Sequence, residues 1–182
     1  MKYLFVLLAL FFTASADAQQ QTKGKTKKHH MESLQQLLED KNVNGSIIEI
    51  DNFIGNVCDY GESMEVLSIP QRKFYINQNL EREVNNGGFH QYFWNSAGEH
   101  AEETVLSLKE IGAVKTAEIL QKAIDMFPKS KVPKNRAERQ KLVEKIDPET
   151  EVWEKLDKKF MDYEEDLNAL NIQFVAKHKA SF

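Results

Sequence analysis

The chain has 182 residues, with 28 acidic and 24 basic side chains and a formal net charge of −4. Its only cysteine, Cys58, excludes an internal disulfide, so packing must hold the core, and we expect Cys58 to be a small buried residue. From Met31 onward there are 27 acidic and 19 basic side chains, a net charge of −8 that argues against nucleic-acid binding.

The first eighteen residues have the pattern of a secretory signal peptide. Lys2 precedes the apolar run YLFVLLALFF, and small residues follow with an Ala-x-Ala spacing at Ala14–Ala16 or Ala16–Ala18. The apolar run is too short to span a bilayer. We therefore expect a mature chain that begins near Asp17 or Gln19, is exported to the periplasm or the cell exterior, and has no stable membrane insertion.

Residues 19–30 are predicted to be a flexible basic tail, since they hold four lysines, two histidines and no apolar residue to bury. Residues 31–182 are predicted to form a single helical domain. Its first element is a short amphipathic helix at about 32–41. The next stretch, IIEIDNFIGNVCDYG, has isoleucine spacing that fits a helix and a β-branched run that fits a strand. We favour a helix because no partner strand is visible.

The following helix starts at Ser68-Ile69-Pro70, with the proline in the first turn, and runs into an asparagine pair. Two helices joined at Gly112 then predict a short antiparallel hairpin, which Pro128 closes. Ala117, Leu120, Ala123, Ile124 and Phe127 are expected inside. Residues 129–140 are charged and contain a proline, so we predict a connector there.

Asp147-Pro148-Glu149 predicts the start of the last helix, with Asp147 as its N-cap. Apolar residues then recur every three or four positions, which predicts one continuous helical seam: Trp153, Leu156, Phe160, Tyr163, Leu167, Leu170 and Phe174. The seam fits packing against the protein's own helices or a coiled-coil dimer, so monomer and homodimer both remain open. Together these elements predict an all-α, compact multi-helix fold.

The other faces of this last segment are acidic. An acidic helix face that keeps a protein soluble is the ordinary interpretation, and the alternative is a surface for a basic protein partner. The candidate partner surface comprises Glu149, Glu151, Glu154, Asp157, Asp162, Glu164, Glu165 and Asp166.

The stretch EVNNGGFHQYFWNS at residues 83–96 is unlike ordinary helix or loop composition. Gly87-Gly88 permits positive φ or close backbone approach, and Asn85 and Asn86 are suited to capping the preceding helix. A sharp helix–turn–helix corner accounts for most of the pattern, and a ligand pocket is the alternative. The candidate site comprises Asn85, Asn86, Gly87, Gly88, Phe89, His90, Gln91, Tyr92, Asn95 and Ser96.

Signatures of catalysis are weak. The glycine pair lacks the spacing of a phosphate loop. His90, His100 and Glu103 are zinc-ligand types without a zinc-binding spacing, and Ser96 near His90 has no evident acid behind the histidine. We predict no catalytic residue, metal or cofactor, and expect a non-catalytic protein-binding module. The alternative is an enzyme or small-ligand receptor at the NNGGFHQY segment.

The central stretch resembles the signature of a bacterial domain family of unknown function whose best-known member is a DNA-mimic protein. The matching residues are Val84–Phe89, Gln91–Phe93, Asn95, Ser96, Gly98 and Ile111–Ala113, within a similarity that spans roughly residues 62–178. The resemblance implies an all-helical fold. It also implies a role in which acidic side chains, spaced like DNA phosphates, occupy the basic DNA-binding face of another protein through long-range, salt-sensitive forces.

Overall fold

The computed structural model describes residues 33–182, so the predicted signal peptide and basic tail lie outside the described residues. The chain divides into two compact units, Met1–Lys41 and Asn42–Phe182. The described part of the first unit contains one short helix at residues 33–39. The predicted extent of a single domain, residues 31–182, stays a prediction.

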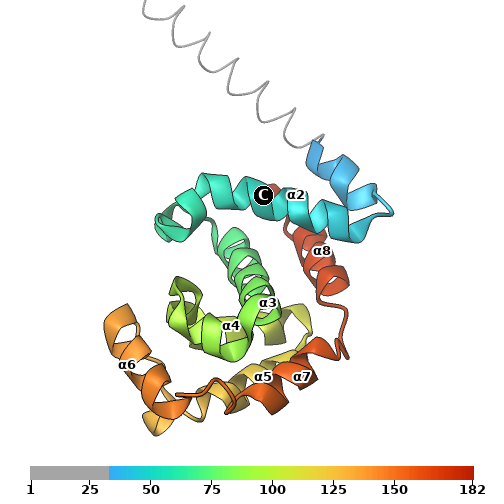
Figure 1. The fold of residues 1–182 in the computed structure, drawn as a ribbon. Coiled ribbons are helices and arrows are strands. Elements are labelled where there is room, and N and C mark those ends of the chain that lie inside the picture. The colour runs from blue at the N-terminus through green and yellow to red at the C-terminus, as the bar shows by residue number, and fades with distance from the viewer. Residues whose placement is uncertain (1–32) are drawn as a thin grey trace, which may run out of the picture. The chain divides into compact units, whose positions relative to one another are not determined.

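The second unit is all-helical, as predicted, and residues 33–182 contain no strand (Figure 1). None of the helices among these residues is long and apolar enough to cross a membrane. The α-helices of the second unit are α2 (Val43–Val57), α3 (Ile69–Trp94), α4 (Ala101–Ile111), α5 (Val114–Ile124), α6 (Arg136–Ile146), α7 (Glu154–Met161) and α8 (Leu167–Lys177). Short 3-10 helices connect or follow them: η1 (Asp59–Gly61), η2 (Met64–Val66), η3 (Ser96–His100), η4 (Pro128–Ser130) and η5 (Lys179–Ser181).

Helix α2 resolves the ambiguous isoleucine-rich stretch in favour of a helix. Asn42 caps it, because the Asn42 Oδ1 accepts a hydrogen bond from the Gly45 N–H at 3.1 Å. The residues at 47, 50 and 54 are isoleucines buried along one face. The helical spacing therefore outweighs the strand propensity of single β-branched residues, because the face has helices to pack on.

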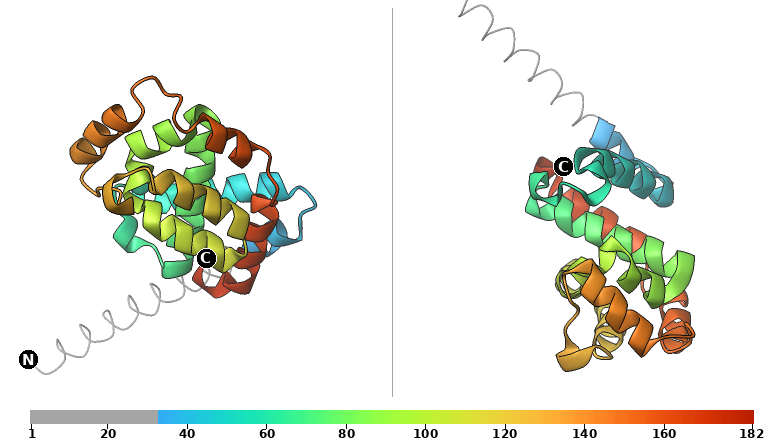
Figure 2. Two further views of the ribbon diagram at one scale, coloured as in Figure 1. Left: turned by 90° about the horizontal axis from the view of Figure 1, so that it is seen from below. Right: turned by 60° about the vertical axis from the view of Figure 1, so that its left-hand side comes forward.

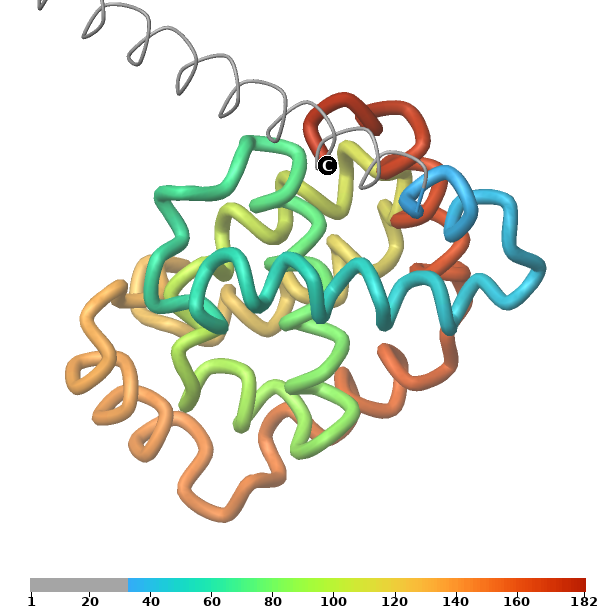
Figure 3. Tube along the Cα trace, turned by 90° about the horizontal axis from the view of Figure 1, so that it is seen from above, coloured from blue at the N-terminus to red at the C-terminus, as the bar shows by residue number. Residues whose placement is uncertain are grey.

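Helix α3 is the central element of the second unit. Ser68 and Gln71 form a reciprocal capping box at its start, and Pro70 lies in the first turn as predicted. The helix lies between α2 on one side and α5, α6 and α7 on the other (Figures 1 and 2). Seen from above, α2 crosses the helices beneath it (Figure 3). Most of the core therefore forms around α3.

The α4–α5 hairpin confirms the prediction from its spacing. Gly112 ends α4 in the left-handed conformation, at φ 93°, and the Ala113 N–H donates to the Leu108 carbonyl at 2.8 Å. The five residues predicted to face inward, from Ala117 to Phe127, are all buried.

The predicted last helix is wrong in two respects. Asp147 does not begin it, because Asp147 follows the end of α6 and the next helix starts at Glu154. The apolar seam is also not one helix: α7 ends at Met161, α8 starts at Leu167, and five residues lie between them. Asp166 caps α8 by accepting from the Ala169 N–H at 2.9 Å, and Tyr163 adopts φ 46° between the two helices. A capping aspartate thus interrupts a pattern that apolar spacing alone would continue.

The predicted connector at 129–140 is also partly helical, because α6 begins at Arg136, after the N-cap Asn135. Arg139 on this helix is fully buried and makes no ion pair with a described carboxylate. Its Nε donates to the Phe93 carbonyl at 2.7 Å, and another guanidinium nitrogen donates to the Asn95 carbonyl at 2.9 Å. These carbonyls lie at the end of α3, where helical partners are missing. The charged run therefore provides a cap for the central helix.

We predict that Arg139→Gln lowers the free energy of unfolding by about 3 kcal/mol, since it removes charge-assisted hydrogen bonds and leaves buried carbonyls unpaired. Arg136→Gln is the matched control. Arg136 is exposed and reaches only the Asn95 Oδ1, at 3.4 Å, so its loss should change stability by less than about 0.5 kcal/mol. Urea denaturation measures both. Equal effects of the two substitutions would contradict the capping role of Arg139.

Candidate functional site

The NNGG motif forms a kink in α3 at which two helical halves meet, because the backbone leaves the helical conformation at Gly87 and Gly88. Gly88 adopts φ 70° and ψ −173°, a conformation that L side chains rarely adopt, while the helix continues to Trp94. Asn85 and Asn86 end the first half of α3, directly before the kink. Neither side chain caps that half: Asn85 donates to Tyr163, and the Asn86 side chain has no hydrogen bond within the described chain. The predicted capping role of the two asparagines is therefore wrong.

Asp157 of α7 holds the kink. The Phe89 N–H, just after the bend, donates to the Asp157 Oδ1 at 2.8 Å. A Cβ at Gly88 would lie 2.5 Å from the other oxygen of the same carboxylate, so only glycine allows this approach. Burial raises the pKa of Asp157, and the hydrogen bond from Phe89 opposes that rise. Asp157 thus serves as an N-cap for the second half of α3, supplied by another helix.

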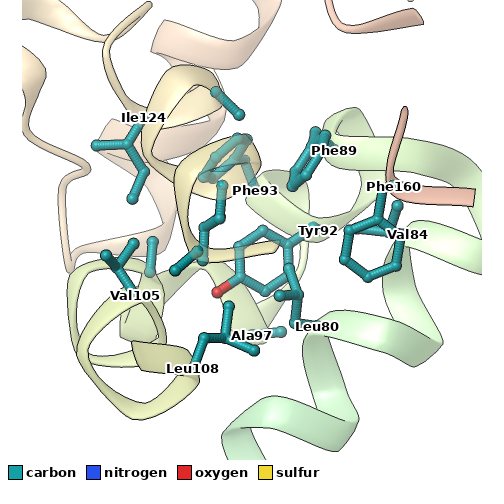
Figure 4. Close-up of a cluster of buried hydrophobic side chains, with 14 of the residues drawn as sticks. Leu80, Val84, Phe89, Tyr92, Phe93, Ala97, Val105, Leu108, Ile124 and Phe160 are labelled. Carbon is teal, nitrogen blue, oxygen red and sulfur yellow. The ribbon is translucent and has the colours of Figure 1, made fainter. Parts of the chain in front are cut away.

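The aromatic residues after the kink belong to the core. Phe89, Tyr92 and Phe93 are fully buried, and Figure 4 shows their rings among Leu80 and Phe160. The Tyr92 hydroxyl donates to the Thr104 Oγ1 at 3.3 Å, and burial raises the pKa of Tyr92 well above its usual range. The FHQYF spacing is therefore explained by packing.

The polar side chains of the motif point in different directions. His90 stacks on Trp94 and its Nδ1 lies 3.1 Å from the Oδ2 of buried Asp147. Gln91 and Asn95 both donate to the Glu83 Oε2, each at 2.8 Å, which ties the helix together across the bend. His90 therefore lies in a different contact from Gln91 and Asn95, which meet at Glu83.

Asn86 and Ser96 are both exposed, and neither side chain has a hydrogen bond within the described chain. The ten candidate motif residues are thus dispersed over a core, a surface and several separate contacts.

Asn85 reaches a polar groove in which two adjoining hollows of about 460 and 340 Å³ share Asn44, Glu81 and Asn168. The Asn85 Nδ2 donates to the Tyr163 hydroxyl at 2.6 Å, and that hydroxyl donates to the Glu81 Oε1 at 3.1 Å. The motif and the segment between α7 and α8 therefore meet at this groove. Sequence reasoning missed five lining residues that come from α2, α3 and the distant α8: Asn44, Asp51, Gln78, Glu81 and Asn168.

Five of the eight residues in the predicted acidic surface have a local structural contact through their side chains. Glu165 accepts from the backbone N–H groups of Lys115 and Thr116 at the start of α5. Exposed ion pairs join Glu154 to Lys158 and Glu164 to Lys115. With Asp157 and Asp166 already placed at helix starts, three of the eight carboxylates remain without a hydrogen bond or ion pair among the described residues: Glu149, Glu151 and Asp162.

Among the residues considered for metal binding or nucleophilic catalysis, His100 and Glu103 lie together, with the His100 Nδ1 3.8 Å from the Glu103 Oε2 and 3.2 Å from an Arg72 nitrogen, whereas His90 pairs with Asp147. Glu103 forms a two-pronged ion pair with Arg72 at 2.7 and 2.8 Å, which lowers the pKa of Glu103. Burial, and then the positive charge of Arg72, lower the pKa of His100. Asp147 provides an acid behind His90, but no hydrogen bond joins Ser96 to His90 in the described chain. Residues 33–182 hold no group of three or more histidine, cysteine or acidic side chains arranged to bind a metal ion.

Comparison with known proteins gives one match. A family model described as DMP19-like protein matches residues 65–178, which contain α3 to α8. No curated protein and no solved structure matches the chain. The match covers the kinked helix and the hairpin, and it also covers part of the polar groove.

We predict that Gly88→Ala lowers the free energy of unfolding by about 2 kcal/mol or more, because an L side chain is strained at φ 70° and its Cβ meets Asp157. Gly87→Ala is the control. Gly87 has φ −168°, which any residue adopts, and its nearest neighbour is the end of the flexible Gln91 side chain. Chemical denaturation should give the smaller loss for Gly87→Ala. A stable Gly88→Ala protein would contradict the structural role of the kink.

Proposed function

This chain belongs to the DMP19-like protein family, and we propose that it is a non-catalytic binding protein whose acidic surface meets a basic protein partner. The observation that carries the proposal is the set of carboxylates that the fold leaves unused at the two ends of α7. Glu149, Glu151 and Asp162 are exposed, and their carboxylates have no hydrogen bond or ion pair within residues 33–182. Fixed carboxylates of this kind attract a basic surface and resemble, in charge, the phosphates of DNA.

The net charge of −8 from Met31 onward would also attract a basic protein surface over long range. A small-ligand site at the NNGGFHQY segment is less well supported, because most of its polar side chains already bind Glu83, Asp147 or the core. Most of the motif is used to build the kinked helix. The acidic side chains at the ends of α7 remain exposed and available to a partner.

The partner-binding prediction is tested by capture on the immobilised protein from extracts of the source cells, with elution by salt or by duplex DNA. The variant Glu149→Gln/Glu151→Gln/Asp162→Asn should lose the captured partner. The control Glu62→Gln/Glu118→Gln/Glu144→Gln removes the same charge from other exposed sites and should retain it. Elution by duplex DNA identifies a DNA-binding face on the partner. A partner kept by the first variant, or insensitive to salt, would contradict the proposal.

We also propose that the protein is exported, because its first eighteen residues have the composition of a signal peptide. Fractionation of the source cells should place the protein in the periplasm or the medium. Terminal sequencing of that material should begin at Asp17 or Gln19. A protein that stays in the cytoplasm and retains its first residues would contradict export.

A further inference from the structure

The polar groove contains an unusual number of buried polar atoms without a protein partner. Within residues 33–182, five buried side-chain atoms have no hydrogen-bond partner, and four of them belong to residues that line the groove. These four atoms are the Asp51 Oδ1, the Gln78 Nε2, the Glu81 Oε2 and the Asn168 Oδ1. Buried polar atoms are normally hydrogen-bonded, because desolvation without a bond costs free energy. Their concentration in one open groove points to a ligand.

The chemistry of these atoms indicates what the ligand carries. Three of the four are oxygen acceptors from α2, α3 and α8, so the ligand must offer several N–H or O–H donors at once. The fourth is the Gln78 Nε2, a donor on a side chain only 8% exposed, which requires an acceptor on the same ligand. A group that is only a donor would leave Gln78 unsatisfied.

The charge of the groove selects a cation. Asp51, Glu81 and Asp166 line it, and among the described lining residues Arg82 is the one cationic side chain. Arg82 contacts the Asp51 Oδ2. Burial raises the pKa of both Asp51 and Glu81; Arg82 opposes the rise at Asp51, and Tyr163 opposes it at Glu81. A bound cation would favour the charged form of both carboxyls.

The shape of the rim favours a side chain with an apolar stem. Ile48 of α2 lines the groove and is 59% exposed, so it offers an apolar surface next to the carboxylates. Arginine has an aliphatic stem and a planar head with five N–H donors, which matches several acceptors better than a compact ammonium group does. A peptide backbone also brings carbonyl oxygens, which supply the acceptor that Gln78 needs.

We propose that the polar groove binds an arginine side chain presented by the basic protein partner. This assignment rests on the proposed function and adds the anchoring residue of the partner. Asn85 of the motif contributes indirectly, because it donates to Tyr163, which in turn donates to the Glu81 Oε1 and leaves the Oε2 open to the ligand. Asn85 and Tyr163 are thus positioning residues for the carboxylate that contacts the guanidinium.

The test uses the purified protein and three blocked tripeptides, Gly-Arg-Gly, Gly-Lys-Gly and Gly-citrulline-Gly, followed by NMR. The arginine peptide should give saturable shifts of the Gln78 and Asn168 side-chain amides and lower the pKa of Glu81. The neutral citrulline peptide should bind at least about tenfold more weakly, a difference of about 1.4 kcal/mol. Glu81→Gln, which keeps the size of the side chain, should weaken the arginine peptide by a similar factor.

Glu49→Gln is the matched control, since Glu49 is an exposed carboxylate on the same helix as Asp51 but does not line the groove. It should leave binding unchanged. Absence of saturable shifts, equal binding of citrulline, or equal loss in the Glu49 and Glu81 variants would overturn the site. Lysine binding as tightly as arginine would overturn the guanidinium assignment, and methylguanidinium binding as tightly as the peptide would indicate a free small cation. The peptide experiment uses no natural partner, so a failure of arginine binding in the groove is distinguishable from a failure to capture a basic partner on the acidic surface.

Discussion

The hydrogen bond from the Phe89 N–H to Asp157 is the contact on which the rest of this structure depends. It fixes the bend at Gly88, and the bend divides α3 into a first half that packs under α2 and a second half that carries the aromatic core. Without the bend, Phe89, Tyr92 and Phe93 could not share one core with Leu80 and Val84 on the same helix. The far end of α3 is fixed by Arg139, so a long central helix is held by side chains from two later helices.

This arrangement also explains why one motif contributes to both packing and surface chemistry. The glycines and the aromatic side chains build the kink and the core, whereas Asn85, just before the kink, faces Tyr163 and the polar groove. The groove keeps two carboxyl groups in positions where burial opposes their ionisation. Retaining such groups costs stability, which is typical of sites that bind a ligand of opposite charge. We infer that Glu81 connects the kinked helix α3 with the polar groove proposed to bind arginine.

The sequence predicted the elements that local signals mark. The proline in the first turn after Ser68, the glycine after α4 and the three-and-four spacing of α5 are short-range patterns, and the structure confirms each of them. The errors arose where tertiary contacts determine where a helix ends or whether a side chain is buried. The apolar spacing predicted one helix where the structure has α7 and α8, because spacing carries no information on Asp166 as the N-cap of a new helix. The charged run around Arg139 likewise gave no indication that this side chain would be buried against backbone carbonyls. Asp51, Glu81 and Asn168 are ordinary surface-type residues in sequence, and only the packing of α2, α3 and α8 brings them together.

Hydrogen exchange at the Phe89 amide tests the central claim most directly. If Asp157 holds the kink, this amide should exchange only through large openings of the protein, with a free energy near that of global unfolding. In Asp157→Ala its protection should fall far more than that of amides in the middle of α5. A Phe89 amide that exchanges as rapidly as an exposed one in the unmodified protein, or that is unaffected by Asp157→Ala, would contradict the account.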